Sequence, residues 1–212
     1  MNRPDAELLV EAYCKGVFPM ADDESGEIHW YSPDPRGVIP LDGFHTPRSL
    51  ARVVRARRFE IRTDTCFQRV MELCAEPRAN DAGTWIDKSL IDAYTELHAA
   101  GCAHSVEAWL EDELVGGLYG VHLRGAFFGE SMFSRGGQGG TNASKVALVH
   151  LVAQLRAAGF LLLDAQFQNP HLHQFGCVEI PRRDYLKMLG LALQIDARWP
   201  QAGPLELPSP SA

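Results

Sequence analysis

Three polar residues stand where the sequence predicts strand ends. Asp164 and Gln166 follow an apolar run, 160–163, that has the length of a buried strand, and Glu130 lies near the end of another strand. Alternation along a strand puts Asp164 and Gln166 on one face and Ala165 on the other. A carboxylate and an amide at such a place suit a reaction in which an amine bound as a cation loses a proton and attacks a carbonyl. The alternative, that these side chains only hold the next loop, stays open.

The elements that must position these residues are helices and strands in mixed order. Helical periodicity and end signals predict helices at 5–15, 47–58, 64–75, 87–101, 142–158 and from 181 onward, with Asp64 and Asp87 as N-caps. Strands are expected at 59–63, 105–110, 114–123, 126–133, 160–163 and 177–180. Tight turns join the strands between 105 and 133 into an antiparallel meander. The pattern therefore predicts an α+β protein.

A domain boundary is expected near the segment 30–36, in which Pro33 and Pro35 flank Asp34. Two prolines so close together favour a rigid loop and exclude a helix or a central strand. We therefore expect a small N-terminal domain over 1–34 and a larger domain over 35–212.

Composition narrows the class of protein. The 212 residues are 46% hydrophobic and 22% charged, as in soluble globular proteins, and no apolar run reaches membrane-spanning length. The first residues lack the apolar core of a signal peptide. Five cysteines, an odd number without a C-x-x-C pair, favour reduced thiols and a cytoplasmic location. We expect no contact with DNA or membrane.

The net charge of −7 gives no hint of nucleic acid, but one helix carries a basic strip. Arg48, Arg52 and Arg55 share a helical face, which suits contact with a phosphate backbone. A solvated helix face is the alternative.

Other chemistries are disfavoured by single residues. Ser131 is not a nucleophile elbow, because Phe133 stands where that motif needs glycine. His171 and His173 have no third ligand close in sequence, so no metal is expected. The glycine-rich stretch 135–141 has Gln138 where an acetyl-CoA-binding loop has its first glycine, so no cofactor is expected either.

Several longer motifs occur together and in order between Tyr13 and Leu186: GVFPM, WYSPDPRGVIP, TWI, AHSVE, ELVGGLYGV, GESMFS, NASK, LLLDAQ and EIPRRDYL. They resemble the leucyl/phenylalanyl-tRNA–protein transferase family. The resemblance implies transfer of leucine or phenylalanine, and sometimes methionine, from Leu-tRNA or Phe-tRNA to the N-terminal Arg or Lys of a protein, which is thereby marked for degradation. It also implies an acetyltransferase-like (GNAT-like) domain with a mixed, largely antiparallel sheet flanked by helices, working without CoA. We expect a monomer.

The resemblance also assigns roles to residues. Asp164 and Gln166 match the family's D-x-Q pair, in which Asp164 would orient Gln166 toward the attacking amine, and Glu130 would bind the cationic end of the acceptor. The aminoacyl pocket is implied at Leu118, Phe127, Met132, Leu148, Leu151 and Leu155. Positions that hold the 3′-terminal adenosine match Trp85, Tyr94, Tyr13 and Met20, where Met20 replaces a tryptophan. The basic strip would contact the tRNA backbone.

Ordinary core packing remains an alternative for each pocket residue. A CoA-dependent N-acyltransferase on the same fold is the alternative enzyme. A non-catalytic protein that binds tRNA ends or basic N-termini is the alternative from another class.

Overall fold

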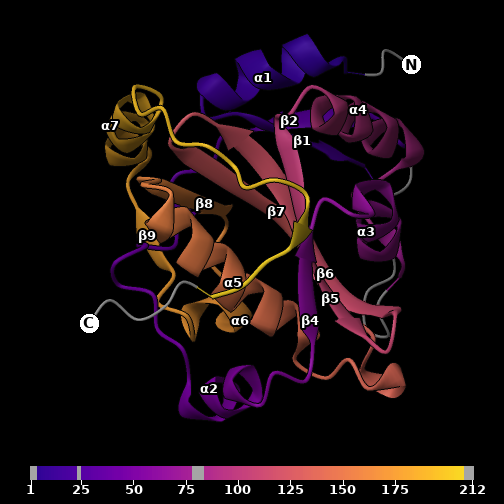
Figure 1. Ribbon diagram of the computed structural model, residues 1–212. Helices are drawn as coiled ribbons and strands as arrows, with labels where there is room; N and C mark the ends of the chain where they lie inside the picture. Colours follow the sequence, from indigo (N-terminus) through magenta and orange to yellow (C-terminus); the bar gives the residue numbers. More distant parts are fainter. Residues whose placement is uncertain (1–3, 23–24, 78–83, 208–212) are drawn as a thin grey trace.

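The computed structural model describes residues 4–22, 25–77 and 84–207. Its main sheet has eight strands in the order β10-β4-β5-β6-β7-β8-β3-β9 (Figure 1). These strands are β3 (Arg36–Val38), β4 (Glu60–Thr63), β5 (Ala103–Leu110), β6 (Glu113–Leu123), β7 (Ala126–Ser134), β8 (Leu162–Gln166), β9 (Val178–Ile180) and β10 (Gly203–Pro204). Only β7 and β8 pair in parallel, so the predicted α+β class with a mixed, largely antiparallel sheet is confirmed. The acetyltransferase-like description remains a prediction.

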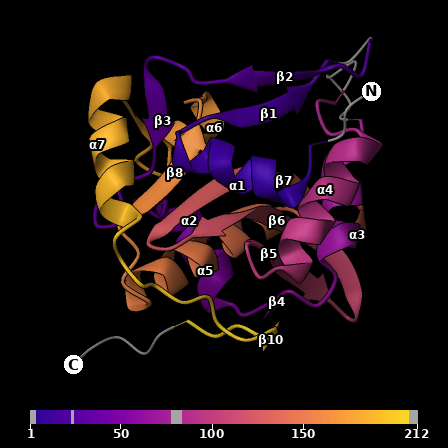
Figure 2. The ribbon, with the colours of Figure 1, turned by 90° about the horizontal axis from the view of Figure 1, so that it is seen from above.

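Helices cover both faces of this sheet (Figures 1 and 2). One apolar core lies under α1 (Ala6–Cys14), α3 (Phe67–Ala75), α4 (Lys88–Ala99) and α7 (Arg182–Ala192). The other lies under α2 (Arg48–Arg55) and α5 (Ala143–Ala157). A short helix, α6 (Pro170–His173), follows β8. No helix among the described residues is long and apolar enough to cross a membrane.

The strongly periodic elements lie where the sequence predicts them. The meander β5-β6-β7 is antiparallel throughout, and Asp87 caps α4 by accepting a hydrogen bond from the backbone N–H of Leu90 at 2.9 Å. The expected strand at 160–163 is displaced, because β8 begins at Leu162 and includes Asp164 and Gln166 themselves.

The expected capping of α3 by Asp64 is wrong. Asp64 has a left-handed backbone (φ 58°), and its carboxylate accepts from the N–H of Ser105 and pairs with His104. The carboxylate of Glu107, on β5, instead accepts from the N–H groups of Thr65 and Cys66, both at 2.9 Å. A negative group from another strand thus satisfies the start of α3, which sequence spacing does not reveal.

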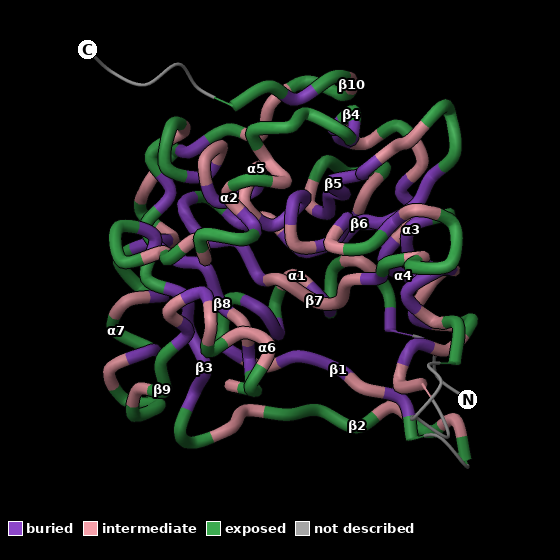
Figure 3. The backbone as a smooth tube through the Cα atoms, turned by 90° about the horizontal axis from the view of Figure 1, so that it is seen from below, coloured by how far each residue is buried: buried purple, intermediate pink, exposed green. Residues whose placement is uncertain are grey.

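The prediction that 30–36 is only a loop is also wrong at both ends. Trp30 and Tyr31 end strand β2 (Ile28–Tyr31), which pairs with β1 (Phe18–Ala21) in a separate two-stranded sheet. Arg36 begins β3, which is an interior strand between β8 and β9. Figure 3 shows β1 buried and β2 largely exposed. The division of the chain at 34 and 35 stays a prediction.

The helix predicted over 47–58 ends earlier, at Arg55, and Arg57 has a left-handed backbone (φ 45°).

The separation of β7 from β8 creates the space for a site. The two strands pair only over Ala126–Phe128 and Leu162–Asp164, yet β7 continues to Ser134 while β8 ends at Gln166. One edge of β7 therefore faces open space instead of a neighbouring strand.

Candidate functional site

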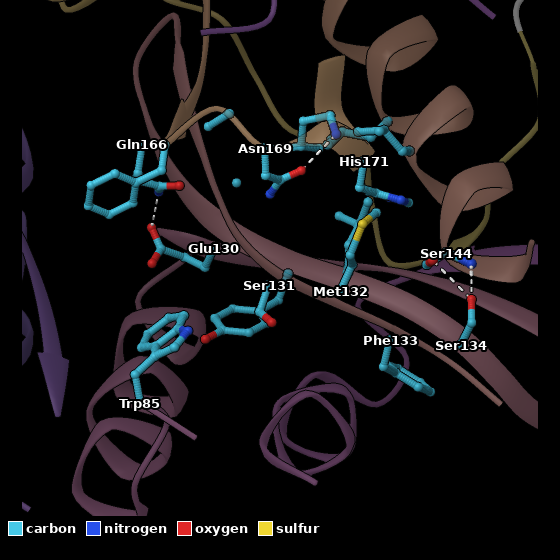
Figure 4. A pocket seen from close by; sticks show the side chains of 18 of the residues that line it. Trp85, Glu130, Ser131, Met132, Phe133, Ser134, Ser144, Gln166, Asn169 and His171 are labelled. Carbon is cyan, nitrogen blue, oxygen red and sulfur yellow. Dashed lines mark hydrogen bonds between the residues drawn. The ribbon is translucent and has the colours of Figure 1, made fainter. Parts of the chain in front are cut away.

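A cavity of about 780 Å³ lies where β7 and β8 part (Figure 4). Its polar wall carries Glu130, Gln166 and Ser131. Its apolar wall carries Leu118, Met132, Leu148, Leu151, Ile39 and Leu163. A cavity with one apolar compartment and a few convergent polar groups is the usual form of a small-ligand site.

Glu130 and Gln166 face each other across the gap. The Gln166 side-chain Nε2 donates to Glu130 Oε1 at 2.9 Å, so the Gln166 carbonyl oxygen is left to accept from a ligand (Figure 4). Glu130 is half-buried in the cavity wall, and burial raises the pKa of its carboxyl group to about 8. The hydroxyls of Tyr13 and Tyr94 bond to each other and, by bonding to the carboxylate, oppose part of that rise. Glu130 can therefore take up or release a proton near neutral pH.

A strained turn fixes the place of Gln166. Its backbone is left-handed (φ 55°), which is uncommon for a residue other than glycine, and the N–H of Phe167 bonds back to the carbonyl of Ala165 at 2.6 Å. A Cβ on Gly37 would lie 2.7 Å from backbone atoms of Phe167 and Gln168, so only glycine lets β3 approach this turn.

Asp164 is held by an ion pair that the sequence did not reveal. Arg36 donates from Nε and Nη2 to the two carboxylate oxygens at 2.9 and 2.6 Å, and the Tyr185 hydroxyl donates at 2.7 Å. The backbone N–H of Gln166 donates to the same carboxylate at 2.9 Å. Arg36 also donates to the carbonyl of Gly16 at 3.0 Å. Asp164 thus has its charge neutralised and its oxygens occupied.

The predicted facing of this strand end is confirmed. Asp164 and Gln166 contact partners on the α1 and α7 side of the sheet, and Ala165 packs against the opposite core. The structure therefore brings together all three residues singled out for chemistry.

The residues matched to the aminoacyl pocket are divided between the cavity and the core. Leu118, Met132, Leu148 and Leu151 line the cavity. Phe127 and Leu155 do not: both are fully buried, and Phe127 stacks on Trp199 with ring centroids 5.2 Å apart. For these two residues the alternative of ordinary core packing holds. Ile39 and Leu163 line the cavity without having been predicted.

The positions matched to the adenosine site fall into two groups. Trp85 and Met20 are half-buried and line the cavity. Tyr13 and Tyr94 are fully buried, with ring centroids 6.5 Å apart, so neither offers a free ring face to a base. Their hydroxyls bond to each other and to the Glu130 carboxylate.

The basic strip is exposed but separate from the cavity. Arg48, Arg52 and Arg55 are exposed on α2, and none of them belongs to the cavity lining. Contact with a phosphate backbone stays a prediction.

Within the described ranges, the side chains of Asp64, His98 and His104 bring potential metal ligands within 4.8 Å of one another. These atoms already take part in hydrogen bonds within the fold. Asp64 accepts from His104 Nδ1 at 2.8 Å, and His98 Nδ1 is hydrogen-bonded to the carbonyl of Ala103 at 2.7 Å.

The chain is similar to known proteins along most of its length. Residues 38–190 match the family model described as leucyl/phenylalanyl-tRNA protein transferase, and residues 2–34 match the model of its N-terminal domain. A leucyl/phenylalanyl-tRNA–protein transferase from Salinibacter ruber is 53% identical over 193 residues, covering 91% of this chain and 82% of the relative. Another, from Herpetosiphon aurantiacus, is 53% identical over 197 residues, covering 92% and 98%. Among solved structures, a conserved protein of unknown function from Staphylococcus epidermidis superposes with a TM-score of 0.41 at 14% identity, covering 85% and 66%.

Proposed function

The chain belongs to the leucyl/phenylalanyl-tRNA–protein transferase family, and from this premise we propose how its site carries out the transfer. The protein is an aminoacyltransferase that moves leucine or phenylalanine from aminoacyl-tRNA to a protein. The acceptors in our proposal are proteins with an N-terminal Arg or Lys, which the added residue marks for degradation. The enzyme acts as a monomer in the cytoplasm, where its tRNA substrate is found.

The proposed mechanism rests on the hydrogen bond that the Gln166 side chain donates to Glu130. The Gln166 carbonyl oxygen accepts from the α-amine of the acceptor and directs its lone pair at the ester carbonyl. The amine attacks in its neutral form, which an α-amine with a pKa of about 8 supplies near neutral pH. Glu130, whose own pKa is about 8, takes the second proton, which the nitrogen loses as the N–C bond forms. The new N–C bond forms, the C–O bond to the ribose 3′ oxygen breaks, and the proton passes to that oxygen. The ester is already activated, so no covalent enzyme intermediate is required.

Asp164 has a positioning role in this proposal. Its oxygens are occupied by Arg36, Tyr185 and the backbone N–H of Gln166, which leaves no free acceptor for a substrate proton. Asp164 therefore holds the turn from which Gln166 acts. Holding the reactants in place can contribute roughly 7–11 kcal/mol to lowering the barrier.

The aminoacyl side chain and the 3′ adenosine that carries it are assigned to different walls of the cavity. The leucyl or phenylalanyl side chain enters the apolar compartment between Leu118, Met132, Leu148 and Leu151. The 3′ adenosine lies against Trp85 and Met20, and stacking on an aromatic ring is worth about 1–3 kcal/mol. The arginines of α2 contact the tRNA backbone. The acetyltransferase-like description of the larger domain is part of this proposal. So is the division at residues 34 and 35, which the separate β1–β2 sheet supports.

The test is transfer of radiolabelled leucine from Leu-tRNA to a peptide that begins with Arg. A peptide that begins with Asp and an incubation with acetyl-CoA serve as controls. Label on the Arg peptide alone is the expected result. Acetyl transfer with the label left on tRNA would replace this proposal with a CoA-dependent acyltransferase. No transfer of either kind would favour a binding protein.

A further inference from the structure

Two partly exposed aromatic rings stand beside the catalytic turn. Phe167 is 47% exposed and lines the cavity, and Tyr31, at the end of β2, is 39% exposed. The buried ring of Phe18 lies between them, edge-on to Phe167 at 5.8 Å and stacked on Tyr31 at 6.0 Å. Phe18 and Tyr31 are also direct cross-strand partners. The three rings form a continuous row from the β1–β2 hairpin to the end of β8.

This row is held rigidly, although its two end members face solvent. The guanidinium of Arg36 sits over the Phe18 ring at 4.8 Å, and the same group is fixed by Asp164. The backbone at Phe167 is fixed by the left-handed turn at Gln166 and by the close approach of Gly37, and its ring packs edge-on against Phe18. Exposed aromatic rings that are fixed in this way are typical of binding surfaces, because little side-chain entropy is lost when they bind.

The position of the row indicates which substrate it meets. In the proposed function the acceptor amine is bound at Gln166. Phe167 is the next residue and lines the same cavity, so its ring is within reach of the acceptor's first side chain. Trp85, which we assign to the adenosine, lies on the opposite side of Glu130 from Gln166 (Figure 4). A lysine ammonium or arginine guanidinium is attracted to the face of an aromatic ring.

Building on the proposed function, we propose that Phe167 and Tyr31 bind the cationic side chain of the acceptor's N-terminal Arg or Lys. The row then determines acceptor specificity, and it does not contact tRNA. The N-terminal hairpin thereby takes part in acceptor selection.

Kinetics with separate variation of the two substrates tests this surface. Phe167→Leu and Tyr31→Leu remove a ring face but keep apolar bulk, and we expect each to raise KM for an Arg-initiated peptide about 2- to 30-fold. KM for Leu-tRNA and kcat stay unchanged, and Phe167→Trp retains the original KM. Trp30→Leu is the matched control: Trp30 is also 39% exposed, but strand alternation puts it on the opposite face from Tyr31. It leaves both KM values unchanged.

A peptide that begins with citrulline, the uncharged analogue of arginine, gives an independent measurement. We expect the unmodified enzyme to have a lower KM for the Arg peptide than for the citrulline peptide, and Phe167→Leu to reduce the ratio of these two KM values. A rise in KM for Leu-tRNA instead of the peptide would overturn the proposal by showing that a tRNA base docks there. Unchanged peptide KM in an active Phe167→Leu enzyme would overturn it as well. Absence of transfer by the unmodified protein would refute the proposed function, and this surface with it.

Discussion

The guanidinium of Arg36 and the carboxylate of Asp164 form a two-point ion pair, 128 residues apart in sequence, in which neither side chain is exposed. Tyr185 and the N–H of Gln166 complete the coordination of the carboxylate. The pair joins β3 to β8 at the point where β8 turns toward the cavity.

Arg36→Met is expected to destabilise the fold strongly. It leaves the Asp164 carboxylate buried without a counter-ion, which typically costs about 3–5 kcal/mol. Urea unfolding monitored by fluorescence measures the change. Arg124→Met is the control, because the Arg124–Asp196 pair is 52% and 66% exposed and such pairs contribute about 0–1 kcal/mol. Equal losses in both variants would contradict the role given to Arg36.

The rate of transfer should depend on the protonation of Glu130. Only the deprotonated carboxylate can take the amine proton, so kcat/KM rises with pH up to about 8, where Glu130 titrates. The α-amine itself has a pKa of about 7.7–8.0, so log kcat/KM rises with a slope approaching two below both values. Glu130→Gln lowers kcat/KM. The slope of log kcat/KM against pH then falls to one, because only the amine still titrates. A slope of one in the unmodified enzyme would exclude Glu130 as the proton acceptor.

The free energy of unfolding should also depend on the protonation of Glu130, but this contribution should fall, not rise, as pH increases. Because the pKa of Glu130 is raised in the folded state, the folded protein holds a proton that the unfolded chain has lost above about pH 4.3. Linkage then requires the contribution of Glu130 to fall as pH rises from about 4.3 to 8. We expect the free energy of unfolding of the unmodified protein, relative to Glu130→Gln, to decline across this window. Denaturant unfolding at several pH values measures it, and parallel curves would refute the raised pKa.

Gln166→Ala should separate catalysis from binding. Loss of one fixed hydrogen-bonding group in a catalytic site commonly lowers kcat about 10²- to 10³-fold. Affinity for Leu-tRNA, measured by filter binding, should stay near normal because the pocket walls are unchanged. Gln166→Asn is the matched variant, because asparagine tolerates the left-handed backbone but holds its amide closer to the chain. We expect it to be as slow as the alanine variant, and normal turnover in either variant would argue against a role for this amide.

Leu151 and Leu155 should respond differently to the same substitution. Leu151 lines the cavity, so Leu151→Phe shortens the apolar compartment and should lower kcat/KM for Phe-tRNA more than for Leu-tRNA, by about 10-fold or more. Leu155 is fully buried away from the lining, so Leu155→Phe should lower stability by about 1–3 kcal/mol without changing the ratio. Competition between the two labelled tRNAs measures the preference. A shift caused by position 155 would show that the cavity extends deeper.

The three residues singled out for the proposed site could be predicted because they combine unusual residue types with a visible strand pattern. Asp164 and Gln166 follow an apolar run, and Glu130 lies in the last strand of the predicted meander. Arg36 was not predictable. An arginine that follows two prolines indicates a loop, and no local periodicity identifies which distant carboxylate it meets. The strands of three or four residues near it are also too short for alternation to be visible.

How far the cavity extends along α5 could not be predicted from the sequence either. Leu148, Leu151 and Leu155 share one face of α5, and that spacing cannot tell where the cavity along the helix ends. Only the separation of β7 from β8 decides that Leu151 borders empty space and Leu155 borders the core.

Arg36 lies between the two segments of the chain that match family models, and its guanidinium binds on both sides of that junction. It donates to the carbonyl of Gly16 in the first segment and to Asp164 in the second. Neither half alone can keep this charge buried and neutralised. Genetic fusions or truncations made at the junction would therefore split an electrostatic unit, and the two halves can be exchanged between relatives only together with their partners for Arg36.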